Sequence, residues 1–141
     1  MTKPRRGRGR EIALQALYRL DVNPDTTAEE ITRFLSGRLH GGPLVEFAES
    51  LVAGVRGRRA ELDTLLDARS ENWRVARMSA TDRAILRIAV FEMLHTSVPG
   101  PVAINEAIEL AKRYGTDASG KFVAGILGRL LADRTAAAAP S

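Results

Sequence analysis

Side chains that could carry out metal or nucleophilic chemistry are few and scattered in this 141-residue chain. It has no cysteine, which excludes disulfides, thiol nucleophiles and thiolate zinc sites. Its two histidines, His40 and His95, are far apart in the sequence, and neither has a second histidine at the spacing of metal ligands. Glutamate pairs one helical turn apart, such as Glu106 and Glu109, lack the Glu-x-x-His step of di-iron bundles. We therefore predict neither a metal nor a cofactor, and a protein that binds rather than catalyses.

The cations are concentrated at the N-terminus, where the first ten residues include Lys3 and four arginines. These residues hold five of the 21 cations and none of the 17 acidic residues, so the rest of the chain has a net charge of −1. A basic arm on a near-neutral globule suits contact with phosphates, and single-stranded RNA is held by cations together with stacking rings. A solubilising tail would explain the charge equally well.

A candidate stacking ring is Phe122, beside Lys121 in the first turn of a predicted helix. Free backbone N–H groups in such a turn can bind a phosphate. The run Gly120-Lys121-Phe122 also resembles the end of a phosphate-binding loop, but the upstream glycine and the following Ser or Thr are absent. Spacing alone favours Phe122 as a core residue of the apolar stripe that contains Ile126 and Leu130.

The elements that must position these residues are helices, since no segment alternates apolar and polar residues for long. Seven helices are expected, at about 8–21, 27–35, 44–55, 62–66, 79–94, 102–114, and from Asp117 or Ser119 through 131. Three of their ends are marked by residue types: a capping box of Thr27 and Glu30 starts the second helix, Ser79 caps the fifth, and Gly115 stops the sixth. Trp73, the only tryptophan, lies in a gap of the pattern at 72–77. The fifth helix is apolar on most sides, which predicts the most buried position.

Two arginines on the fifth helix are candidates for structural ion pairs. Arg83 and Arg87 lie one turn apart on a helix that is otherwise too apolar to be exposed. Glu92 and Glu106 are their expected partners, which would link the fifth helix to the sixth.

The predicted fold is therefore all-α, a compact bundle of about seven helices in two three-helix subbundles around a shared core. It forms a single domain, 1–134, with the basic arm at 1–10, and the alanine-rich tail 135–141 is expected to be disordered. No apolar run approaches the ~20 residues of a membrane span. The N-terminus lacks the apolar stretch of a secretory leader, so we expect a cytoplasmic protein that does not associate with membranes.

Four segments of the chain carry recognisable motifs: Arg10–Tyr18 (REIALQALY), Asp82–Ala89 (DRAILRIA) with Glu92, Pro101–Lys112 (PVAINEAIELAK) with Tyr114-Gly115, and Ser119–Val123 (SGKFV) with Gly125–Leu127 (GIL). Together they resemble the NusB family of bacterial transcription antitermination factors. These segments follow the family's order and spacing and span nearly the whole chain.

The resemblance implies a NusB-like helical protein that binds RNA and pairs with NusE, a ribosomal protein of the small subunit. Together the two would bind the single-stranded boxA element of nascent ribosomal RNA transcripts and promote processive transcription by the RNA polymerase elongation complex. The implied RNA contacts are Arg6, Arg8 and Arg10 in the arm, with Arg5 added from the charge pattern, and Lys121 and Phe122 in a second patch. Tyr18 and Asp82 match positions that face NusE. This match favours Phe122 as a ligand-binding ring over a core residue.

The sequence departs from the family pattern at several positions. Gly7 and Gly9 alternate with arginines, so the arm is expected to be looser than a continuous basic helix. Ala118 stands where the family often has an acidic residue before its serine, and Ala124 replaces the usual asparagine. The two alanines leave the detail of the second RNA patch open.

Two other classes of function compete with this interpretation. NusB-like folds are also found as targeting modules of ribosomal RNA methyltransferases, but 141 residues leave no room for a methyl-donor domain. The second is a DNA-binding regulator with a helix-turn-helix, which nothing in the sequence excludes except the resemblance. Matched RNA and DNA binding experiments would distinguish an RNA-binding from a DNA-binding protein.

Overall fold

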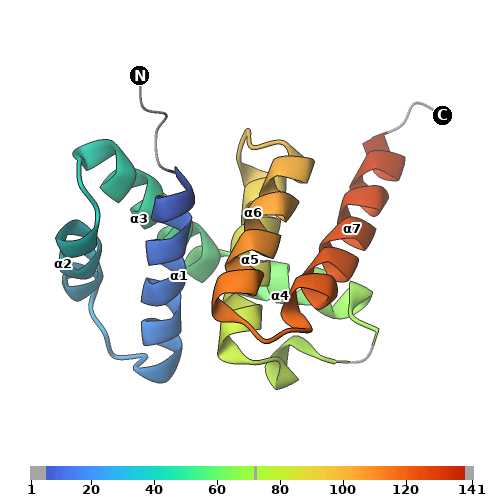
Figure 1. Cartoon of the computed structure of the whole chain (residues 1–141), viewed down its shortest axis with the longest axis horizontal. Coiled ribbons are helices and arrows are strands. Elements are labelled where there is room, and N and C mark those ends of the chain that lie inside the picture. Colours follow the sequence, from blue (N-terminus) through green and yellow to red (C-terminus); the bar gives the residue numbers. More distant parts are fainter. Residues whose placement is uncertain (1–5, 72, 139–141) are drawn as a thin grey trace. The chain divides into compact units, whose positions relative to one another are not determined.

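The structure is a computed structural model that describes residues 6–71 and 73–138, so Arg5 lies outside the described residues. Within these ranges it contains seven α-helices, one 3₁₀ turn and no strand, which confirms the expected all-α fold. The elements are α1 (Arg6–Val22), α2 (Ala28–Arg38), α3 (Gly42–Gly57), α4 (Arg59–Arg69), the 3₁₀ turn η1 (Val75–Arg77), α5 (Ala80–His95), α6 (Gly100–Tyr114) and α7 (Ser119–Ala138) (Figure 1). No helix within these ranges is long and apolar enough to cross a membrane.

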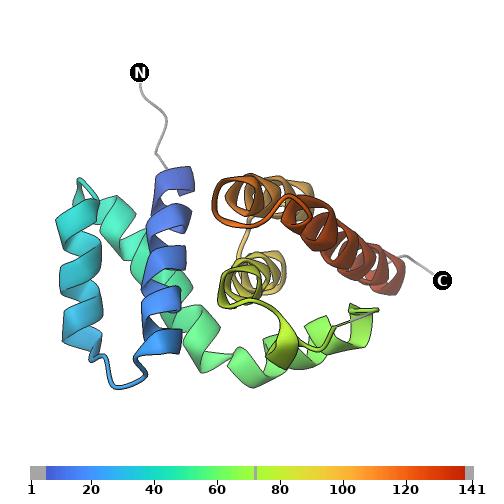
Figure 2. The ribbon, with the colours of Figure 1, turned by 60° about the horizontal axis from the view of Figure 1, so that its bottom comes forward.

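The helices fall into two compact units, residues 1–57 with α1–α3 and residues 58–141 with α4–α7. In the first unit each helix contacts the other two, and α1 and α2 run side by side while α3 crosses them obliquely (Figure 2). The second unit contains a fourth helix beyond the three expected for a subbundle. There α5 and α7 each contact all three of the other helices.

The start of α1 is more ordered than its glycines suggested. The helix already includes Arg6 and continues through Gly7 and Gly9, so the expected loose arm is wrong over this stretch. A Cβ atom at Gly9 would lie 2.8 Å from the Phe47 ring, so the glycine allows α1 and α3 to pack closely. The guanidiniums of Arg6 and Arg10 lie 4.7 and 5.2 Å from the centre of the same ring. These contacts offset the helix penalty of about 1 kcal/mol that each glycine carries.

The predicted capping box at the start of α2 is confirmed. The Glu30 N–H donates to the Thr27 hydroxyl at 3.1 Å, and the Thr27 N–H donates to the Glu30 carboxylate at 3.2 Å. The backbone hydrogen bond from Thr27 holds the pKa of Glu30 below its usual value. The carboxylate therefore supports the cap above its normal pKa, and this support is lost only as the pH falls through the lowered pKa.

The expectation that the fifth helix is the most buried is also supported. All ten residues of α5 from Ala84 to Met93 are buried, including Arg87 and Glu92. However, the predicted link between Arg87 and the sixth helix is wrong. Arg87 Nε and Nη2 donate to the two carboxylate oxygens of Asp63 on α4, at 2.7 and 2.9 Å. This paired contact therefore connects α5 to α4.

The C-terminal helix is longer than expected. Residues 135–138 continue α7, so the prediction of disorder from Thr135 is wrong for these four residues, and 139–141 lie outside the described ranges. Alanine has the highest helix propensity, and the Thr135 hydroxyl donates to the Leu131 carbonyl at 3.0 Å. The alanines therefore favour continuation of the helix over a coil, and the Thr135 hydroxyl is satisfied within it.

Candidate nucleic-acid interface

The loop between α6 and α7 is a tight turn that sets the position of Phe122. Ser119 is buried, and its hydroxyl accepts a hydrogen bond of 2.9 Å from the Thr116 N–H. Gly115 ends α6, as predicted, by donating its N–H to the Ala111 carbonyl at 2.9 Å. A Cβ atom at position 115 would lie 2.5 Å from the Ser119 hydroxyl oxygen and 2.7 Å from the Ala111 carbonyl oxygen. Only glycine fits there, so this residue holds the turn in place.

We expect Gly115→Ala to lower the free energy of unfolding by about 1–3 kcal/mol, the usual range for overpacking. The new methyl group would meet the Ala111 carbonyl, and backbone atoms cannot move aside cheaply. Urea unfolding followed by circular dichroism measures the change. Gly37→Ala is the matched control because nothing lies within 4 Å of a Cβ atom at that helical position. It should be neutral or slightly stabilising. Equal stability of both variants would contradict the role of Gly115.

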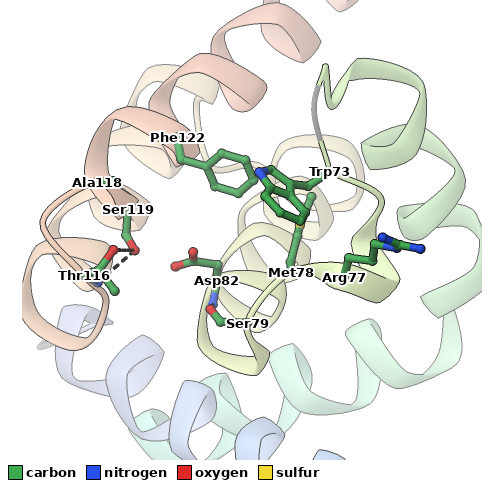
Figure 3. A pocket seen from close by; sticks show the side chains of 9 residues that line it. All are labelled: Trp73, Arg77, Met78, Ser79, Asp82, Thr116, Ala118, Ser119 and Phe122. Atoms are coloured by element: carbon green, nitrogen blue, oxygen red, sulfur yellow. Dashed lines mark hydrogen bonds between the residues drawn. The ribbon is translucent and has the colours of Figure 1, made fainter.

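Phe122 lines a pocket of about 240 Å³ in the second unit. The pocket is formed by the segment that contains η1, the start of α5, the α6–α7 loop and the start of α7 (Figure 3). Its lining residues are Trp73, Arg77, Met78, Ser79, Asp82, Thr116, Ala118, Ser119 and Phe122. We call it the Trp73–Phe122 pocket.

Phe122 is neither a fully exposed stacking ring nor a core residue, the two alternatives that the sequence left open. Its side chain is half-buried, and the ring points into the pocket toward Trp73 (Figure 3). The core of α7 is made instead by Val123, Ile126 and Leu127, all at most 1% exposed. Lys121 is exposed beside it. The first turn of α7 thus presents a cation to solvent and a ring to the pocket.

Asp82 lines the same pocket, although it lies 40 positions before Phe122 in the sequence. Ser79 caps α5, as expected, and its hydroxyl accepts a hydrogen bond of 3.1 Å from the Asp82 N–H. Oxygen Oδ1 of Asp82 is buried, and no described residue donates a hydrogen bond to it. Arg77 is exposed at the edge of the pocket. The pocket therefore combines aromatic rings, a nearby cation and an unused hydrogen-bond acceptor.

Trp73 and Arg77 are two pocket residues to which the sequence pattern assigned no function. Trp73 is 53% exposed, although tryptophan is the largest apolar side chain. The signal was present in the sequence: the only tryptophan stands in a gap of the helical pattern, where no apolar stripe requires it. Trp73 and Arg77 from that gap line the pocket.

The arginines of the N-terminal arm have unequal surroundings. Arg6 and Arg8 are exposed, and Arg8 forms an ion pair of 2.7 Å with Glu11. Arg10 is only 4% exposed and lies over Phe47, so the prediction that it is an accessible RNA contact is not supported by its position. On the same helix, Tyr18 is 48% exposed, as expected for a residue outside the apolar stripe.

Comparison with known proteins places the chain in a family. A model of the NusB family matches residues 8–132. "Transcription antitermination protein NusB" of Anaeromyxobacter dehalogenans is 47% identical over 127 residues, which is 89% of each chain. The protein of that name from Bacillus velezensis is 41% identical over 130 residues, 92% of this chain and 97% of its own.

Solved structures agree with the sequence matches. NusB of T. maritima superposes with a TM-score of 0.82 at 35% identity, covering 94% of both chains. A chain from the complex of antitermination factors NusB and NusE with double-stranded RNA has the same fold, with a TM-score of 0.81 at 24% identity over 94% of this chain and 99% of that one. The sequence segments, the helical architecture and these matches together show that the chain belongs to the NusB family.

Proposed function

We propose that this protein is a cytoplasmic transcription antitermination factor that binds boxA-type RNA together with NusE and carries out no reaction of its own. The observation that carries the proposal is the start of α7, where exposed Lys121 adjoins the ring of Phe122 at the pocket. Cations on the backbone and rings under the bases are the features that hold single-stranded RNA. In support, its relatives are named transcription antitermination proteins, and one solved structure of the same fold contains NusE and RNA.

In this proposal the two ends of the chain have different tasks. Arg6 and Arg8 contact phosphates, together with Arg5, which lies outside the described residues. Arg10 supports α1 from within through its stacking on Phe47. Lys121 and Phe122 form the second RNA contact, and Tyr18 and Asp82 face NusE.

A mobility-shift experiment tests the proposal directly. The labelled probe is a boxA-type RNA, added with and without purified NusE, and the controls are a scrambled RNA and a DNA of the same sequence. We expect the boxA RNA to bind more tightly than both controls, and NusE to strengthen that binding. Equal binding to the DNA would favour a DNA regulator, and no preference for boxA would refute the proposal.

The double variant Arg6→Ala, Arg8→Ala should weaken the dependence of RNA binding on salt. Each neutralised phosphate of a single strand contributes about −0.7 to the slope of log affinity against log salt concentration. Losing two such contacts should therefore make the slope shallower by about 1.4, measured by fluorescence anisotropy between low and physiological salt.

The matched control for this experiment is Arg33→Ala, Arg56→Ala, which removes the same charge from exposed positions elsewhere in the first unit. Its slope should match that of the unmodified protein. If the two double variants have the same slope, the arm is only a solubilising segment. We expect Arg10→Ala to lower thermal stability because its side chain is buried.

We expect Tyr18→Asp to weaken association with NusE at least about tenfold while leaving the melting temperature nearly unchanged. The side chain is 48% exposed, so its loss leaves no large cavity. Isothermal titration with purified NusE measures the affinity, and Asp82→Lys should act in the same direction. Val102→Asp, which places the same charge at a 44% exposed apolar site on α6, serves as the control. A large drop in melting temperature with normal NusE affinity would show instead that Tyr18 is a packing residue.

A further inference from the structure

We infer that the Trp73–Phe122 pocket holds a single RNA base carrying an exocyclic amino group, with Trp73 as a stacking wall and Asp82 Oδ1 as the acceptor. The inference rests on the proposed RNA-binding function and names the part of the RNA that this pocket takes. It adds Trp73 and Arg77 to the proposed RNA contacts and gives Asp82 a second role.

The first argument is the exposure of the rings. Trp73 is 53% exposed and Phe122 is half-buried, and both line the pocket from different elements (Figure 3). Among the described residues, neither ring stacks on another aromatic side chain. A base stacks on such a ring because every base has a π-face. The pocket volume of about 240 Å³ suits one ring system and is smaller than the ~300–1,000 Å³ of typical small-molecule sites.

The second argument is the way in which Trp73 is held. The segment 73–78, which carries Trp73 and contains η1, is held at Val75, because Asp67 accepts a hydrogen bond of 2.7 Å from the Val75 N–H. At its C-terminal end, Arg83 Nη1 donates to the Met78 carbonyl at 3.0 Å and lies within 3.5 Å of the Val75 carbonyl. The Ser70 hydroxyl donates to the carbonyl of Trp73 itself. An exposed indole on a segment pinned in this way is a preformed platform, which lowers the entropic cost of binding.

The third argument is the unused acceptor. Asp82 Oδ1 is buried in the pocket wall without a donor among the residues that the structure describes. A buried polar atom without a partner destabilises the free protein, and a ligand that supplies a donor removes this penalty. An ionised carboxylate can only accept, so it selects amino groups, as in the pairing of Asp with the N4 amino group of cytosine. Adenine, cytosine and guanine offer such a group, whereas uracil does not.

The remaining groups fit the same ligand. Arg77 is exposed at the pocket edge and has no ion-pair partner among the described residues, so it can contact the phosphate of the bound nucleotide. Only one oxygen of Asp82 is both buried and unpaired, so the second oxygen remains free for the proposed contact with NusE.

Trp73 itself reports on the pocket, since it is the only tryptophan in the chain. The probes are ten-nucleotide oligo(A), oligo(C) and oligo(U), titrated into the full-length protein at low salt while tryptophan fluorescence is recorded. We expect oligo(A) and oligo(C) to quench the emission and to bind about tenfold more tightly than oligo(U), in line with the discrimination of a good base contact.

Variants separate the two roles of the pocket. Trp73→Ala should weaken binding of oligo(A) at least about fivefold in a mobility shift. Trp73→Phe, which keeps an aromatic ring, should retain most of the affinity of the unmodified protein. Asp82→Asn presents a donor as well as an acceptor, so the preference against oligo(U) should shrink in the fluorescence titration. Arg77→Ala should weaken all three oligonucleotides alike, whereas Arg56→Ala, which removes the same charge at an exposed site in the first unit, should not.

Three results would overturn the inference. If boxA RNA binds but Trp73 fluorescence stays constant and Trp73→Ala binds normally, the pocket is not a base site, although the proposed function stands. If no RNA binds even with NusE, both fail. If the fluorescence responds to purified NusE alone and not to RNA, a protein side chain occupies the pocket instead.

Discussion

Arg87→Met should lower the free energy of unfolding by about 2–3 kcal/mol. The Arg87 side chain is 9% exposed and makes two hydrogen bonds to Asp63, at 2.7 and 2.9 Å. Removing one partner of a buried ion pair costs roughly 3–5 kcal/mol because the other charge is left uncompensated. The Asp63 side chain is 27% exposed and regains some hydration, which places the expected loss below that range. Chemical unfolding in urea measures it.

Two variants test the cause of this loss. Arg59→Met removes the other arginine near Asp63. The Arg59 Nε atom lies 3.9 Å from the Asp63 carboxylate, and the Arg59 side chain is 60% exposed. As a surface pair it should contribute only about 0–1 kcal/mol. The double variant Arg87→Met, Asp63→Leu should recover part of the stability, since no unpaired charge remains. If Arg87→Met stays within about half a kcal/mol of the unmodified protein, the pair has no structural role.

Phe122→Ala should lower the affinity for RNA by about 1–3 kcal/mol, the usual contribution of a stacking ring. The ring lines the pocket beside Trp73 and is half-buried, so its removal takes away part of the base site and little of the core. The free energy of unfolding should therefore fall by less than the roughly 3–5 kcal/mol typical of a fully buried phenylalanine. RNA affinity and urea unfolding are measured on the same preparation.

Phe91→Ala is the matched control for this experiment. Phe91 lies on α5 and is 9% exposed, so the same substitution should cost the full 3–5 kcal/mol of a buried ring. RNA affinity of its folded fraction should be unchanged. A strongly destabilised Phe122→Ala protein whose folded fraction binds RNA normally would return Phe122 to the core and remove it from the proposed RNA contacts.

The sequence alone determined the features that depend on neighbours within a few residues. The helical periodicity predicted seven helices, and the residue types at Thr27 with Glu30 and at Ser79 predicted two helix starts. The continuous apolar pattern of α5 predicted its burial. Capping and periodicity are local effects, because a cap spans three residues and a helix turn spans 3.6. The family segments added the expectation of RNA and partner contacts, which remains for the experiments above to test.

Only the tertiary structure decided which helix faces meet. Periodicity assigns a residue to a face but does not say which other helix covers that face. Arg87 is therefore paired with Asp63, 24 positions earlier, and Arg10 is covered by Phe47 through a close approach that Gly9 permits. In the same way, Trp73 and Phe122, nearly fifty residues apart, line one pocket. The sequence did not predict that they meet, because an exposed ring carries no periodic signal. The sequence shows which functional group each residue carries, but tertiary packing determines which other groups it contacts.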